Sequence, residues 1–143
     1  MVATVLNQRA VWACQRTLDE WLAANDQVKS ALVATQDGFE VAACGVADEQ
    51  QQARLAAMSS SLLALSHSVT DEVLLPGCDS LMIDGINGKL LIMAVPGSAP
   101  DLLLTVVSQP QAAMGRLLMD ARFTAMVVRR QLLNHAEREY RLA

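Results

Sequence analysis

The segment 102–107, Leu-Leu-Leu-Thr-Val-Val, constrains the fold more than any other part of this chain. A β-strand points successive side chains to opposite faces of its sheet, so a nearly continuous apolar run indicates a strand that is covered on both faces. The sequence therefore predicts a sheet with helices available for both of its sides.

Two more strands are predicted directly before this segment. Residues 80–84 lead to Asn87-Gly88, a strong hairpin signal, and residues 89–95 return as a strand. Proline and glycine in the segment 96–100 then indicate a loop before the strand that begins at Leu102. We expect three consecutive antiparallel strands here.

A further hairpin is predicted nearer the N-terminus. Residues 28–35 and 39–44 read as strands on either side of Asp37-Gly38, a pair that suits the positive backbone angles of a two-residue type I′ turn. The chain thus contains five predicted strands.

Three helices are predicted from apolar residues spaced by three and four. The first covers residues 10–22, and the second begins at Asp48, which forms a capping box with Gln51. Its apolar seam consists of Leu55, Met58, Leu62, Leu65 and Val69. In the last helix we place Pro110 in the first turn, capped by Ser108 or Gln109. Phe123, Met126 and Val127 lie off the main apolar stripe of that helix, which therefore has more apolar surface than one contact uses.

The element order is helix, two strands, helix, three strands, helix, which predicts an α+β fold with a five-stranded antiparallel sheet flanked by helices on both faces. We expect the strand order 2-1-5-4-3, with the third strand at an open edge that can pair with another copy. Residues 1–143 are expected to form one domain with a core of about residues 11–133, and the tail 134–143 is expected to fray.

Composition limits the classes of partner. Hydrophobic residues make up 52% of the sequence and charged residues 18%, which leaves apolar surface for a protein partner. The net charge of -4 argues against nucleic-acid binding, which requires a basic face. The apolar runs are too short for a membrane-spanning helix and the start lacks a signal-peptide pattern, so we expect no membrane insertion and a cytoplasmic location.

Catalytic and metal-binding chemistry has little support in the sequence. Cys14, Cys44 and Cys78 are widely spaced without a C-x-x-C pair, and we interpret them as structural thiols. His67 stands between two serines, but neighbouring residues of a helix point in different directions, which disfavours a Ser-His pair. No phosphate-binding glycine motif is present, so we expect no cofactor, no metal and no catalytic residue.

The hairpin Ala-Leu-Val-Ala-Thr-Gln-Asp-Gly-Phe-Glu-Val-Ala at residues 31–42, the small-residue helix at 55–62, and the strands at 88–95 and 102–107 together resemble the roadblock/LC7 family over about residues 11–133. The resemblance implies a homodimer that pairs through its third strands and second helices into a ten-stranded sheet. It also implies contacts with Ras-like small GTPases, or a platform role in signalling complexes.

Carried over to this chain, the dimer and partner interface consists of Leu55, Met58, Leu62, Leu65, Val69, Leu81, Met82 and Ile83. We therefore expect a non-catalytic regulatory or scaffold protein, and do not favour Arg54 as an arginine finger. The alternative is a small-molecule sensor with a pocket between sheet and helices, against which the aromatic content of 3% weighs. An enzyme that uses Cys44 or Cys78 ranks last.

Overall fold

The computed structural model describes residues 6–98 and 101–142, with side chains described up to residue 135. Its elements are α2 (Gln8–Ala24), β1 (Val28–Thr35), β2 (Glu40–Cys44), α3 (Glu49–Glu72), β3 (Ser80–Gly85), β4 (Gly88–Ala94), β5 (Leu102–Ser108) and α4 (Met114–Leu142). The predicted order of helices and strands is confirmed. α4 continues to Leu142, and fraying of its last turns stays a prediction.

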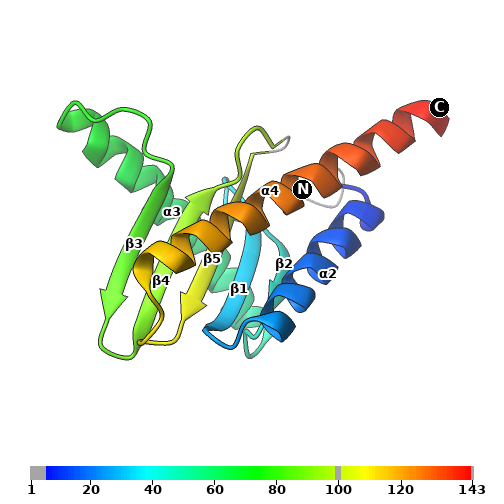
Figure 1. The fold of residues 1–143 in the computed structure, drawn as a ribbon. Helices are drawn as coiled ribbons and strands as arrows, with labels where there is room; N and C mark the ends of the chain where they lie inside the picture. Colours follow the sequence, from blue (N-terminus) through cyan, green and yellow to red (C-terminus); the bar gives the residue numbers. More distant parts are fainter. Residues whose placement is uncertain (1–5, 99–100, 143) are drawn as a thin grey trace.

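The five strands form one antiparallel sheet in the order β2-β1-β5-β4-β3, as predicted. Helices α2 and α4 lie on one face, and α3 lies on the other (Figure 1). Central strand β5 is buried on both faces from Leu102 to Val106, which explains its nearly continuous apolar sequence. Strand β3 occupies one edge of the sheet.

Two apolar clusters hold the layers together. The larger lies between the sheet and the α2/α4 layer and includes Leu18, Val33 and Leu104. The smaller lies under α3 and includes Leu32, Leu63 and Ile92. Alternate residues of the same strands supply the two clusters, so the sheet separates the α3 side of the molecule from the α2/α4 side.

Both predicted hairpins exist, but their turns differ from the expectation. The β1–β2 connection has four residues, 36–39, with Gly38 N–H donating to the Thr35 carbonyl at 3.0 Å and Gly38 at φ +104°. In the β3–β4 hairpin the two turn residues are Ile86 and Asn87. Neither Asp37 nor Asn87 has a positive φ, so neither turn is type I′. The glycines follow the turns, and a Cβ on Gly88 would collide with the Ser108 carbonyl oxygen.

The helix starts are set by side-chain caps at two of the three helices. Asn7 caps α2 by accepting from the Ala10 N–H at 2.7 Å, and Asp48 caps α3 by accepting from the Gln51 N–H at 2.7 Å. Gln51 accepts in return from the Ala47 N–H, one residue before the position that we expected. The prediction for α4 was wrong, because Pro110 lies in a turn and the helix begins at Met114.

Candidate functional site

The outer edge of β3 is the first part of the candidate site. β3 pairs with β4 along one side, and no described strand pairs with its other side. An unpaired strand edge carries backbone N–H and C=O groups that are ready to pair with a further strand. The ion pair between Lys89 Nζ and Asp84 Oδ1, 3.8 Å apart, joins β3 to β4 near the turn.

The side chains of β3 alternate between the two faces of the sheet. Leu81 pairs with Ile92 and packs with the cluster under α3, and Ile83 points to the same side. Met82 lies on the opposite face and packs against the larger cluster. Its side chain therefore points away from those of Leu81 and Ile83, because successive residues of a strand face opposite ways, and its place in the predicted interface stays a prediction.

The second part of the site is the side of α3 that turns away from its own sheet. The residues of α3 that are buried are Ala56, Ser59 and Leu63, spaced by three and four. The small side chains of the first two let the helix lie close to the sheet. The predicted seam runs along a neighbouring side of the helix, where Leu55 and Leu62 are half-buried against the smaller cluster.

The remaining seam residues face solvent. Met58 is 55% exposed, Leu65 61% and Val69 56%, and Ile83 on β3 is 46% exposed. We use the name α3–β3 surface for Leu55, Met58, Leu62, Leu65, Val69, Leu81 and Ile83. Large apolar side chains at helical spacing beside an open strand edge are typical of a protein contact surface.

The C-terminal end of α3 extends this apolar exposure. The end of the helix projects beyond the sheet near the start of β3 (Figure 1). Val73, Leu74 and Leu75 follow the helix and are 59%, 85% and 64% exposed. Leu74 has a φ of +60°, a left-handed conformation that leucine adopts at a cost. The apolar surface is thus about as long as the helix.

The hydroxyl groups of α3 do not form a catalytic arrangement with His67. Ser66 Oγ donates to the Leu63 carbonyl at 2.7 Å, and Ser68 Oγ donates to the Ala64 carbonyl at 3.3 Å. Both hydroxyls are therefore bound to the helix backbone. No described hydrogen bond joins the imidazole of His67 to either serine, so the geometry gives a Ser-His pair no support.

The thiols of Cys14 and Cys44 are poorly suited to nucleophilic chemistry. Burial raises the pKa of Cys14 to about 12. Burial raises the pKa of Cys44 to about 11, with the Asp19 carboxylate adding to the shift by hydrogen bonding and by charge repulsion of the thiolate. A protonated thiol is a weak nucleophile. Cys78 is half-buried and its Sγ lies 3.7 Å from Ser66 Oγ and 3.4 Å from the Ser80 carbonyl oxygen.

The described part of the chain has neither a metal-binding cluster nor a membrane-spanning helix, and it has a small hollow beside β4. Within it, no group of three His, Cys, Asp or Glu side chains is arranged to hold a metal ion. None of its helices combines the length and the hydropathy needed to cross a membrane. A hollow between β4 and α4, lined in part by Met93 and Met126, has a volume of about 140 Å³. Ligand pockets usually occupy roughly 300–1,000 Å³, so this hollow is too small for one.

Sequence reasoning missed a larger groove between α2 and α4. Its only signal in the sequence was the excess of apolar residues on the last helix. Phe123 and Val127 were placed off the main stripe, and both line this groove, where Phe123 is 71% exposed. How α2 lies beside them depends on tertiary packing, which periodicity along a single helix does not specify.

Comparisons with known proteins agree with this architecture. The family model of the roadblock/LC7 domain matches residues 15–108. A roadblock/LC7 domain from Streptomyces avermitilis superposes with a TM-score of 0.74 at 17% identity, covering 83% of this chain and 97% of that one. The gliding protein MglB of Thermus thermophilus gives 0.74 at 16% identity, covering 91% and 96%.

An MglB structure in a tetrameric arrangement gives a TM-score of 0.75 at 18% identity, covering 91% of this chain and 95% of that one. A search among curated proteins found no match. At these identities the solved structures establish the fold alone, whereas the family model spans most of the sequence. The open β3 edge, the apolar α3 and the matched residues 15–108 lead to one conclusion: this chain belongs to the roadblock/LC7 domain family.

Proposed function

We propose that the protein forms a homodimer through the α3–β3 surface, and that the paired α3 helices bind a Ras-like small GTPase. One observation carries this proposal. Met58, Leu65, Val69 and Ile83 expose 46–61% of their surface on one side of the molecule, next to an unpaired strand edge. Exposed apolar side chains and free backbone groups are both satisfied when a second copy presents the same surface.

The proposed dimer follows from twofold symmetry. In a twofold interface each protomer contributes the same residues, so β3 pairs with the β3 of the second copy. The two five-stranded sheets then form one ten-stranded sheet, and the two α3 helices lie on the same side of it. Family membership and the tetrameric arrangement of the similar MglB support self-association.

The GTPase proposal rests on the family and on the chemistry of α3. The protein would act as a regulator or scaffold in the cytoplasm, without a catalytic residue of its own. Arg54 is exposed one turn before Met58, but we do not assign it a catalytic role. An apolar platform with few charges binds a partner through a small number of buried anchors, which suits a regulatory contact.

The dimer is tested by measuring the solution mass at micromolar concentration with light scattering. The proposal expects a mass near twice the 15.4 kDa of one chain. Leu65→Asp should shift this mass toward the monomer, because it places a charge in the apolar interface. Phe39→Asp is the matched control, because Phe39 is also exposed but lies outside the α3–β3 surface.

The GTPase contact is tested by affinity capture from the cell lysate of the source organism, in the presence of either GDP or a non-hydrolysable GTP analogue. Wild-type protein should retain a Ras-like GTPase that mass spectrometry identifies. Met58→Asp should lose it, while Phe39→Asp should keep it. A dimer that captures no small GTPase in either nucleotide state would contradict the partner assignment and leave the dimer assignment standing.

A further inference from the structure

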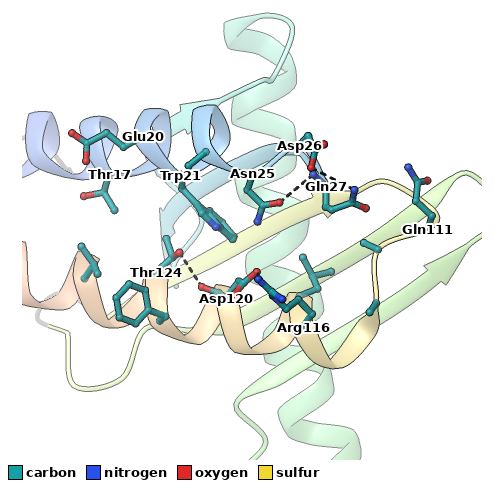
Figure 2. Close-up of a pocket in the computed structure, with 16 residues that line it drawn as sticks. Thr17, Glu20, Trp21, Asn25, Asp26, Gln27, Gln111, Arg116, Asp120 and Thr124 are labelled. Atoms are coloured by element: carbon teal, nitrogen blue, oxygen red, sulfur yellow. Dashed lines mark hydrogen bonds and ion pairs between the residues drawn. The ribbon is translucent and has the colours of Figure 1, made fainter.

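A groove lies on the other face of the sheet, between the C-terminal half of α2 and the N-terminal half of α4. Its volume is about 850 Å³. Figure 2 shows Trp21 pointing from α2 into the space between the two helices, with Arg116, Asp120 and Thr124 on α4 opposite. The loop residues Asn25, Asp26, Gln27 and Gln111 line one end. Its lining residues on α4 run from Arg116 to Val127, about three helical turns, so the groove suits an elongated ligand.

The groove has an apolar floor and an exposed aromatic side chain. Leu117 and Ala112 are 3% and 6% exposed and form part of the floor, and Trp21 is half-buried. Phe123 belongs to the lining as well, but it is 71% exposed. A phenylalanine this exposed gains little from folding. It supplies an apolar anchor for a partner instead.

The lining is acidic. Glu20, Asp26 and Asp120 oppose a single basic residue, Arg116, which gives the lining a net charge of -2. Arg116 Nε lies 3.6 Å from Asp120 Oδ2, and Glu20 Oε1 lies 2.9 Å from the Nε of Arg16, outside the lining. Asp26 forms no ion pair within the described residues. The groove therefore attracts cationic side chains and repels nucleic acid and anionic lipid.

The groove is lined by α2 and α4 and therefore lies on the opposite face of the sheet from α3. Helices α2 and α4 cover one face, and α3 covers the other. Dimerisation through the α3–β3 surface would leave the groove of each protomer open. The groove is thus available for a partner other than the one that binds α3.

We infer that the groove binds an amphipathic helix of another protein, with apolar residues along one face and Lys or Arg beside them. A helix that lies between two helices presents side chains at i, i+3, i+4 and i+7 to the floor and walls. Its apolar side chains contact Trp21 and Phe123, and its basic side chains reach Asp26 and Glu20. The inference does not depend on the proposed dimer or on the GTPase.

The test uses a display library of helical peptides, each about 18 residues or five turns long, selected on the full chain. We expect enrichment of peptides with apolar residues at helical spacing and an excess of Lys and Arg. Binding is then measured by fluorescence in the Trp12→Phe protein, because the chain has two tryptophans and Trp21 becomes the only one. A spectral shift on binding places the selected peptide in the groove.

Two matched pairs of variants decide the outcome. Phe123→Ala should weaken binding of the selected peptide roughly tenfold or more. Phe39→Ala, which changes the only other phenylalanine, should leave the peptide affinity unchanged. Asp26→Lys should weaken peptide binding more than Asp37→Lys does, because Asp37 is an exposed aspartate outside the groove. Circular dichroism checks that each variant is folded. Because Phe123 is exposed, we expect the Phe123→Ala protein to fold normally.

Three results would overturn the inference. Selected peptides without a basic excess would remove the charge argument. Equal binding by Phe123→Ala and Phe39→Ala would place the peptide elsewhere. A change in solution mass caused by Phe123→Ala alone, without peptide, would show that a second copy of this chain occupies the groove. The first two results leave the α3–β3 surface untouched. After the third, Leu65→Asp would decide whether self-association also uses that surface.

Discussion

Leu63 and Leu65 lie two residues apart on α3, yet only one of them belongs to the proposed interface. Leu63 is 2% exposed and packs on the sheet, whereas Leu65 is 61% exposed on the other side of the helix. Replacing each by alanine removes the same atoms from the same helix. The two variants therefore differ in one respect, which is where the lost contacts lie.

The expected magnitudes follow from burial. Leu63→Ala should lower the free energy of unfolding by about 2–5 kcal/mol, the usual cost of a buried leucine. Full burial of a leucine is worth roughly 1.5–3 kcal/mol, so the 61% of Leu65 that is exposed has up to about 1–2 kcal/mol to gain at an interface. A twofold dimer contains this position twice, so Leu65→Ala should weaken dimerisation by up to about 2–4 kcal/mol, or roughly 30- to 700-fold.

Sedimentation equilibrium measures the dissociation constant of the dimer. Urea unfolding at protein concentrations below that constant measures the stability of the monomer. Leu65→Ala should leave the monomer within about 0.5 kcal/mol of wild type, as surface substitutions usually do. If Leu65→Ala and wild type had the same dimer constant, the assignment of this helix face would fail. A Leu65→Ala monomer as unstable as Leu63→Ala would show instead that Leu65 supports the fold.

Three further substitutions test separate features. Leu74→Gly should raise the stability of the monomer by about 1 kcal/mol in urea unfolding, because it relieves the left-handed backbone, and should weaken the dimer in sedimentation. Asp19→Asn should speed alkylation of Cys44 at mildly alkaline pH, followed by mass spectrometry, because losing the carboxylate lowers a thiol pKa that now stands near 11. Gly88→Ala should lower the free energy of unfolding in urea by about 1–3 kcal/mol through its collision with a β5 carbonyl, whereas Gly115→Ala, in a helix with open space around it, should not lower it and should raise it by up to about 1 kcal/mol.

Sequence reasoning found the element order, the strand order and the open edge because these depend on strong local signals. The apolar run of β5 and the cap at Asp48 each have one clear structural meaning. The turn types were wrong because a glycine beside Asp or Asn was assigned to the turn itself. In the structure, Gly38 and Gly88 follow their turns, where a positive φ or a close backbone approach requires glycine.

The two faces of α3 could not be separated from sequence alone. Two sets of residues repeat at helical spacing, and the set with larger side chains was assigned to the interface without identifying which set packs on the sheet. The residues that pack on the sheet are the smaller Ala56 and Ser59 together with Leu63. Close approach of a helix to a sheet favours small residues, which contribute little to a hydrophobicity pattern. The same limit applies to Met82, whose face is fixed by strand register.

Leu74 combines an exposed apolar side chain with a left-handed backbone conformation. The end of α3 is closed by two backbone hydrogen bonds, from Leu75 N–H to the Thr70 carbonyl at 2.7 Å and from Leu74 N–H to the Asp71 carbonyl at 3.1 Å. This arrangement places Leu74 in the left-handed conformation, where glycine is favoured and leucine costs roughly 1–2 kcal/mol. Its side chain is 85% exposed, so the fold of one chain recovers none of that cost. A contact outside the monomer would recover it, which supports a proposed interface that continues past α3 into residues 73–75.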